Sequence, residues 1–200
     1  MSALALGFCL HFSQKCIVEF APLGDLLKYV RRYDPPEDML ARIMYQVGQA
    51  LAFIHSCGIV HRDMKPENVL MDATHTPKLT DFGYCDRVDQ DGYCENPMFC
   101  GTTDYFSPWM LDDLPCSYFV DTWAFGVIIF DLLVGFPPFH ERNHKATYRR
   151  IRNCDVRWND PKVAEATRNC RPLLEQIFVP DARDVPTMNE VLQDYLFYLE

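Results

Sequence analysis

Four polar residues have the types and the spacing that phosphoryl transfer requires. Asn68 lies five residues after Asp63, Lys65 lies between them, and Asp81 lies eighteen residues after Asp63. A carboxylate can accept the proton of an attacking hydroxyl, and an ammonium group can neutralise charge on the transferred group. Carboxylate and amide oxygens are ligands that Mg²⁺ accepts. We therefore predict that Asp63 is a catalytic base and Lys65 a charge stabiliser. Asn68 and Asp81 are the predicted metal ligands.

The segments around these residues must bring them into one cleft. Residues 69–72 and 77–80 have the pattern of a short hairpin, which would present Asn68 and Asp81 together. A helix is predicted over residues 36–57, ending at Cys57-Gly58, and its task would be to support the loop that begins at His61. Its apolar face repeats at spacings of three and four residues: Met39, Ile43, Val47, Leu51 and Ile54.

The rest of the chain is predicted to be mostly helical, with two short strands at its start. The strands are expected over residues 4–12 and 16–20, and a long irregular loop over residues 84–106. An apolar helix is expected to begin at Asp121 and to end at Gly135, too short to span a bilayer. Further amphipathic helices are expected around residues 145–151, 164–178 and 188–199.

Composition and charge limit the class of protein. The 200 residues are 48% hydrophobic, which suits one domain, and 28 acidic against 19 basic residues give a net charge of −9. This balance argues against nucleic-acid binding. The nine cysteines are odd in number and match no zinc spacing, and no signal segment follows Met1. We therefore expect a reduced, cytoplasmic protein without membrane contact.

The run from His61 to Asn68, followed by Asp81-Phe82-Gly83, resembles the catalytic loop and metal motif of the eukaryotic protein kinase family. Taken singly, Asp63 also suits a turn, Asn68 a helix cap and the second motif a loop closing a strand. Together, at the spacing of the two family motifs, these residues favour the resemblance to protein kinases over the separate local roles. The resemblance implies an α+β, kinase-like fold and transfer of the ATP γ-phosphate to protein substrates, with Mg²⁺. Lys65 resembles serine/threonine rather than tyrosine kinases.

The resemblance also assigns roles elsewhere. Residues 100–108 resemble the end of an activation segment, which holds the peptide, and Thr102 would bond Asp63 and Lys65. Asp121 would pin the backbone of the catalytic loop. Residues 18–25 resemble the hinge between the two lobes, although without the family they indicate only a loop. The resemblance also implies a set of contacts with ATP from this segment and from the catalytic region. They are backbone groups of Glu19 and Ala21 with adenine, Leu70 beneath the adenine, Val18 behind it, Asp25 near the ribose or peptide, and Lys65 at the phosphate.

The chain departs from the family at its start. No Gly-rich loop, strand Lys or helix Glu precedes Leu4. We expect residues 1–200 to be a kinase domain that is incomplete at its N-terminus, with residues 1–20 a remnant of the small lobe and 21–200 the large lobe. The alternative function is an inactive scaffold that binds partners. A finer resemblance to the SH3-binding kinase group rests on the hinge and on Trp123-Ala124-Phe125-Gly126.

Two other departures concern ion pairs. Trp109 stands where the family places a Glu that pairs with the Arg matched to Arg183. We hypothesise that Trp109 stacks on Arg183, or that Asp112 or Asp113 takes over the pairing. Arg62 implies control by activation-loop phosphorylation, but Met98 occupies the usual phosphosite. There are two alternatives to a phosphate at position 98. Glu95 could supply a fixed negative charge, or Tyr93 or Thr103 could be modified.

Overall fold

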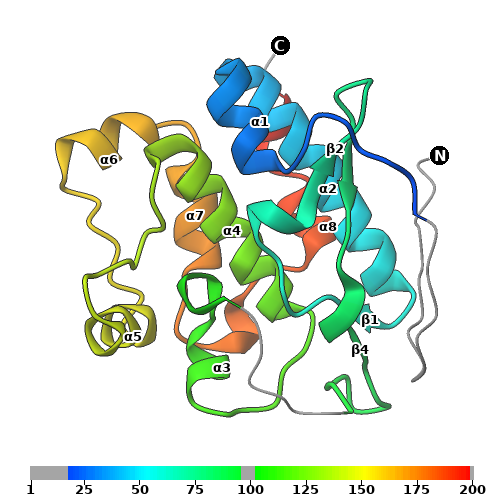
Figure 1. The fold of residues 1–200 in the computed structure, drawn as a ribbon. Coiled ribbons are helices and arrows are strands. Elements are labelled where there is room, and N and C mark those ends of the chain that lie inside the picture. The colour runs from blue at the N-terminus through cyan, green and yellow to red at the C-terminus, as the bar shows by residue number, and fades with distance from the viewer. Residues whose placement is uncertain (1–17, 96–101, 199–200) are drawn as a thin grey trace.

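A computed structural model describes residues 18–95 and 102–198 (Figure 1). Helices and 3₁₀ turns make up about half of it, and four short strands form two small antiparallel sheets. The α-helices are α1 (Leu26–Tyr33), α2 (Glu37–Ser56), α3 (Pro108–Leu111), α4 (Phe119–Val134), α5 (His144–Arg152), α6 (Pro161–Ala166), α7 (Arg171–Ile177) and α8 (Met188–Val191). The strands are β1 (Ile59–Val60), β2 (Val69–Met71), β3 (Pro77–Leu79) and β4 (Asp86–Arg87). Short 3₁₀ turns cover Pro66–Asn68, Phe82–Tyr84, Thr103–Tyr105, Ala182–Asp184 and Tyr195–Tyr198.

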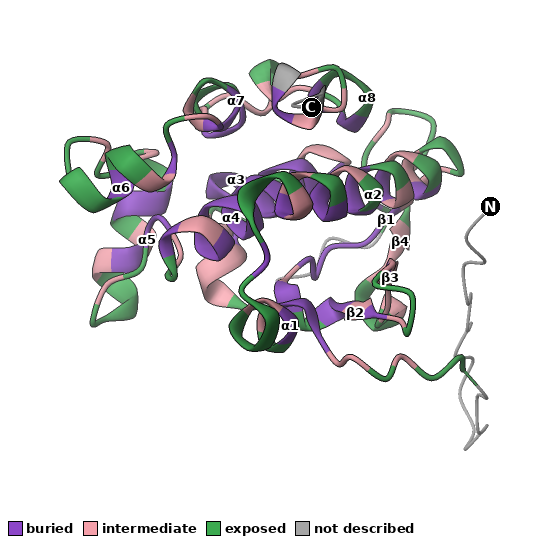
Figure 2. Cartoon of the chain, turned by 90° about the horizontal axis from the view of Figure 1, so that it is seen from above, coloured by how far each residue is buried: buried purple, intermediate pink, exposed green. Residues whose placement is uncertain are grey.

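The elements form three layers, with α2 and α4 in the middle (Figure 2). Helices α7 and α8 cover one side and contact α4 and α2 respectively, while the β2–β3 hairpin and α1 lie on the other. This arrangement confirms the predicted α+β fold, in which helices predominate over short strands. It also leaves the candidate catalytic loop between the central helices and the hairpin.

Helix α2 follows the predicted pattern closely. It begins after Pro36, and Glu37 and Asp38 in its first turn suit the positive end of the helix dipole. Ile43, Val47 and Leu51 are buried along one face, as predicted. The helix ends where Gly58 takes a left-handed conformation (φ 74°), which glycine adopts without steric cost. The chain then turns directly into β1 and the catalytic loop.

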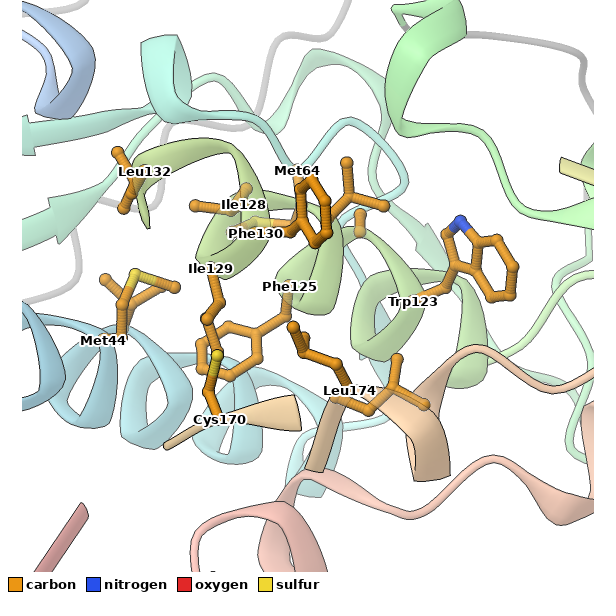
Figure 3. Close-up of a cluster of buried hydrophobic side chains, with 14 of the residues drawn as sticks. Met44, Met64, Trp123, Phe125, Ile128, Ile129, Phe130, Leu132, Cys170 and Leu174 are labelled. Carbon is orange, nitrogen blue, oxygen red and sulfur yellow. The ribbon is translucent and has the colours of Figure 1, made fainter. Parts of the chain in front are cut away.

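Helix α4 is buried on almost every side (Figure 3). Its Trp123 stacks on Phe139 with ring centroids 5.4 Å apart and meets Phe178 edge-on at 5.2 Å. Gly126 is required here, because a Cβ at this position would lie 2.8 Å from a methyl group of Ile177. The helix ends at Gly135 (φ 92°). α4 is therefore the central helix of the described fold.

Three element predictions need correction. The helix expected over residues 164–178 is interrupted between α6 and α7, because Pro172 in the first turn of α7 cannot donate the hydrogen bond that a continuous helix needs. The helix expected over 188–199 stops at Val191, and Asp194 instead bonds the Leu196 N–H at 3.0 Å in a local turn. Residues 18–20 lie in no strand, and the rest of the two expected N-terminal strands lies outside the described residues.

No helix in the described ranges combines the length and the apolar composition that a membrane-crossing helix needs.

Candidate active site

The loop that carries Asp63 is fixed by one buried carboxylate. Asp121, in the first turn of α4, accepts hydrogen bonds from the backbone N–H groups of His61 and Arg62, both at 2.8 Å. The His55 side chain on α2 bonds the same carboxylate at 2.9 Å. These bonds hold the pKa of Asp121 below its ordinary value, although burial by itself would raise it. The predicted anchoring of the loop by Asp121 is present.

Two residues of the candidate site have backbone conformations that are uncommon for residues with a side chain. Arg62 has φ 66° and Asp81 has φ 57°. Such residues persist only where the surroundings over-determine them. The backbone N–H of Arg62 is held by its bond to the Asp121 carboxylate. The carboxylate of Asp81 accepts a 3.4 Å bond from the Gly83 N–H.

Asp63, Lys65 and Asn68 form one hydrogen-bonded cluster. Oδ2 of the buried Asp63 accepts from Lys65 Nζ at 2.8 Å and from Asn68 Nδ2 at 3.0 Å. The amide of Asn68 also bonds the Asp63 carbonyl at 2.7 Å. Lys65 Nζ reaches Thr102 Oγ1 at 3.2 Å, as predicted, but Thr102 makes no bond to Asp63. The structure thus brings together three of the four predicted catalytic residues by direct contact.

The fourth residue, Asp81, is brought near by the predicted hairpin. β2 and β3 pair in antiparallel register, with Val69 opposite Leu79. Beyond that pair, the Thr80 N–H bonds the Asn68 carbonyl at 3.0 Å. The imidazole of His61, which is fully buried, bonds the Thr80 carbonyl at 2.9 Å. Asn68 and Asp81 therefore lie at the same open end of the hairpin, next to the catalytic loop.

The donor set at this end fits Mg²⁺. The Asn68 amide nitrogen is bonded to Asp63, whereas its Oδ1 receives no hydrogen bond from the residues that the structure describes. The exposed carboxylate of Asp81 accepts only the long bond from Gly83 in the same ranges. Both are hard oxygen ligands, and Mg²⁺ in phosphate sites commonly takes one or two protein oxygens and completes its shell with phosphate and water.

The hinge segment (residues 18–25) joins the site only in part. Leu23 and Gly24 pair with the backbone of Met71, so the end of this segment lies along β2. The Glu19 carbonyl and the Ala21 N–H make no hydrogen bond within the described ranges, and the Glu19 carboxylate instead pairs with Lys78 at 2.8 Å. The Val18 side chain is 65% exposed, so it does not lie at the back of a pocket.

Leu70 and Asp25 meet where the hinge segment joins the hairpin. They form an isolated β-bridge, and Leu70 is half-buried. Both oxygens of Asp25 are bonded to Lys28, Oδ1 to its N–H at 2.9 Å and Oδ2 to its ammonium at 2.6 Å. Burial alone would raise the pKa of Asp25, but these bonds lower it. Asp25 is thus an N-cap of α1, and a ribose contact would require Lys28 to move.

Arg62 has a partner that the sequence did not suggest. Its side chain is 5% exposed, pairs with Asp86 at 3.3 Å and donates from Nε to the Tyr84 carbonyl at 2.6 Å. Asp86 lies in β4, which pairs with β1 just before the catalytic loop. The fixed charge beside Arg62 is therefore Asp86, whereas the exposed Glu95 bonds the Arg87 carbonyl through its backbone. Met98 lies outside the described residues.

Both hypotheses about Trp109 and Arg183 are wrong. Trp109 is buried and donates from Nε1 to the Pro180 carbonyl at 3.1 Å, and its ring meets Phe119 at 5.0 Å. Arg183 points outward, 87% exposed, and pairs with Asp181 at 2.6 Å. Asp112 pairs with Arg152 instead. An indole hydrogen bond and aromatic packing thus hold the residue that follows the predicted substrate segment (residues 102–108; called the substrate segment below), at the position where the resemblance implies an ion pair.

A further contact of the substrate segment was missed from the sequence. The Tyr105 hydroxyl donates to Asp131 Oδ2 at 2.8 Å, and Asp131 is buried in the second half of α4. Burial raises the pKa of Asp131, with a further contribution from the charge of Glu67. The available signal was Asp131 itself, the one charged residue within the apolar run from Trp123 to Phe136.

Comparison with known proteins places this site in a family. Residues 8–197 match the protein kinase domain. An Aurora kinase of Candida glabrata is 37% identical over 166 residues, which cover 82% of this chain and 45% of that protein. Aurora kinase C of Mus musculus is 36% identical over 143 residues (71% and 51%), and Aurora kinase B of Drosophila melanogaster is 31% identical over 183 residues (89% and 53%).

The chain spans about half the length of these relatives. None of the three is an SH3-binding kinase, so the finer resemblance to that group gains no support from them. The match over residues 8–197, together with the cluster of Asp63, Lys65 and Asn68, leads to one conclusion. The chain belongs to the protein kinase family and is similar to its eukaryotic serine/threonine members.

Proposed function

We propose that this chain transfers the γ-phosphoryl group of ATP to serine or threonine hydroxyls of protein substrates. The observation that carries the proposal is the cluster in which Asp63 Oδ2 accepts from both Lys65 and Asn68, beside the open end of the hairpin. Family membership supports the same reaction. The cluster orients one carboxylate, one ammonium group and one amide without help from a ligand.

Asp63 would act as the base through its second oxygen. Oδ2 is occupied by Lys65 and Asn68, whereas Oδ1 accepts no hydrogen bond from the described residues. That oxygen is free to accept the proton of an incoming hydroxyl. Lys65, which also bonds Thr102 of the substrate segment, would neutralise charge on the transferred group. The site thus joins the proton acceptor to the residues that hold the peptide.

Asn68 Oδ1 and the Asp81 carboxylate would hold Mg²⁺, and the family generally uses ATP with this ion. Bound Mg²⁺ neutralises phosphate charge and orients the γ-phosphoryl group. The unbonded Glu19 carbonyl and Ala21 N–H would contact adenine, with Leu70 beneath it. Asp25 would reach the ribose only after exchanging its bond to Lys28.

Two broader assignments belong to the same proposal. Residues 21–200 would correspond to the large lobe of the kinase domain and residues 1–20 to part of the small lobe. The cytoplasm is the proposed location, supported by five described cysteines that are free thiols: Cys57, Cys85, Cys94, Cys154 and Cys170.

A phosphotransfer assay tests the reaction. Wild type, Asp63→Asn and Asp113→Asn are incubated with labelled ATP, Mg²⁺ and a protein substrate such as casein. Asp113 is an exposed loop residue with φ 53°, a conformation that Asn tolerates equally, so it is a matched control. We expect Asp63→Asn to lower the rate by roughly 10² to 10⁴, with no change in the control.

Equal, background-level labelling by all three proteins would reject the enzyme reading for this polypeptide. The alternative function, an inactive scaffold that binds partners, would then be the better one. Phosphate found on tyrosine instead of serine or threonine would contradict the proposed substrate class.

A further inference from the structure

A hollow beside helix α5 has an unusual charge for this chain. Its volume is 420 Å³, and its lining contains basic and uncharged residues but no acidic one. The chain as a whole has 28 acidic against 19 basic residues. We call this hollow the α5 groove; its lining residues are Asn143, Lys145, Ala146, Arg149, Arg152 and Asn153.

Three cations follow one face of α5. Lys145, Arg149 and Arg152 are spaced by four and then three residues, which puts them on the same side of a helix. Arg152 is already bound to Asp112 at 2.6 Å. Lys145 and Arg149 are exposed, and within the described ranges their side chains have neither an ion pair nor a hydrogen bond. Two positive charges therefore face the groove without a partner.

Helix stability explains only part of this pattern. Arg149 and Arg152 lie in the last turn of α5, where cations complement the helix dipole. Lys145 lies in the first turn, where a positive charge is unfavourable for the same reason. Its position is therefore not explained by the helix, whereas a negatively charged occupant of the groove would stabilise it.

The groove lies beside the elements that follow the proposed peptide site. Helix α3 follows the substrate segment directly, and α3 and α5 are in contact (Figure 1). Arg152 Nη2 bonds the Leu111 carbonyl at the end of α3 at 3.0 Å. His140, shortly before α5, bonds Asp104 of the substrate segment at 3.1 Å. A protein held at residues 102–108 can therefore extend over α3 to the groove.

We propose that the α5 groove docks an acidic segment of the protein substrate, rich in Asp and Glu and distant from the phosphorylated residue. The inference rests on the proposed function for the identity of the occupant. Lys145 and Arg149 attract the segment, and the groove contributes specificity and association rate rather than chemistry. Because both cations are exposed, the interaction weakens as salt is added.

Binding of a peptide tests the groove without ATP. The probe is a fluorescein-labelled peptide rich in Asp and Glu that contains one serine, followed by anisotropy at low and high salt. The variants are Lys145→Glu/Arg149→Glu, the neutral Lys145→Gln/Arg149→Gln, and the control Arg168→Glu. Arg168 is exposed at the end of α6 and lines no part of the groove. Circular dichroism checks that each variant is folded.

We expect the charge-reversed variant to bind about tenfold or more weakly, the neutral variant to fall between, and the control to match wild type. If charge reversal leaves the affinity unchanged, the docking proposal is wrong even if phosphotransfer is active. Stronger binding of a single-stranded oligonucleotide than of the peptide would also overturn it. If peptide binding depends on both cations but the chain has no transferase activity, the docking proposal stands and the proposed phosphoryl transfer is wrong.

Discussion

Helix α4 carries a buried carboxylate near each end, and the two behave oppositely. Asp121 is 1% exposed and Asp131 is 7% exposed, so both have lost nearly all contact with water. The pKa of Asp121 lies below its ordinary value, whereas burial raises the pKa of Asp131. Burial therefore does not decide which form of a carboxyl group this helix favours.

The number of donors accounts for the difference. Asp121 accepts from the N–H groups of His61 and Arg62 and from the His55 ring. Asp131 accepts from the Tyr105 hydroxyl alone among the described residues. Charge-assisted hydrogen bonds offset the loss of hydration when there are enough of them. Asp121 can thus fix the candidate catalytic loop as a charged group, while Asp131 joins the substrate segment to α4 at an electrostatic cost.

The largest effect is expected for Asp121→Asn. An amide cannot accept from all three donors, and leaving polar groups of a buried charged cluster unpaired costs about 3 to 5 kcal/mol. We expect the free energy of unfolding to fall by this amount at neutral pH, measured by urea denaturation. A loss below 1 kcal/mol would show that Asp121 does not anchor the loop.

The same variant has a defined pH dependence. The lowered pKa of Asp121 means that its contribution to stability is fully present above the unfolded-state pKa of about 3.9 and is lost as the pH falls through the lower folded-state value. The stability difference between wild type and Asp121→Asn should therefore shrink only below about pH 4. A difference that already shrinks between pH 7 and 5 is not compatible with this origin.

A smaller loss is expected for Tyr105→Phe. The substitution keeps the ring and removes the donor to Asp131, which leaves the buried carboxylate without that bond. The cost is about 2 kcal/mol for a hydrogen bond to a charged group, and the pKa of Asp131 should rise further. Tyr84→Phe, at an exposed position, is the control for loss of a hydroxyl. Equal melting temperatures of the two variants would contradict the assignment.

Asp131→Asn should change stability by less than about 1 kcal/mol, and in the opposite direction from Asp121→Asn. The raised pKa means that ionised Asp131 costs stability at neutral pH, and this cost disappears as the pH falls through the folded-state value. Asn still accepts from Tyr105 and carries no charge. Chemical denaturation at pH 7 and pH 4 measures the sign, and a destabilisation comparable to that of Asp121→Asn would remove the contrast.

The smallest effect is expected at an exposed ion pair. Arg183 pairs with Asp181 in solvent, so Arg183→Leu should leave the melting temperature unchanged. Trp109→Phe, which removes the bond to Pro180, should lower it measurably. A large loss for Arg183→Leu together with none for Trp109→Phe would restore the ion-pair role that the family assigns to Arg183.

Local spacing predicted most of the fold and the arrangement of the catalytic loop. The 3.6-residue pattern located α2, and the hairpin between Asn68 and Asp81 followed from the short run between them. The Asp121 anchor came from the family resemblance. What failed depends on contacts that spacing does not encode. The carboxylate beside Arg62 is Asp86 rather than Glu95, and Trp109 bonds the Pro180 carbonyl rather than contacting Arg183, because packing between distant segments selects these partners.

The most direct test of the site is to map where the metal binds. Mn²⁺ is added as a paramagnetic substitute for Mg²⁺ to the ¹⁵N-labelled chain with ATP, and the broadening of backbone amide signals is measured by NMR. We predict the strongest broadening at Asn68 and Asp81, at the open end of the hairpin, and its loss in Asp81→Asn. Broadening centred elsewhere, or none at these two residues, would contradict the account.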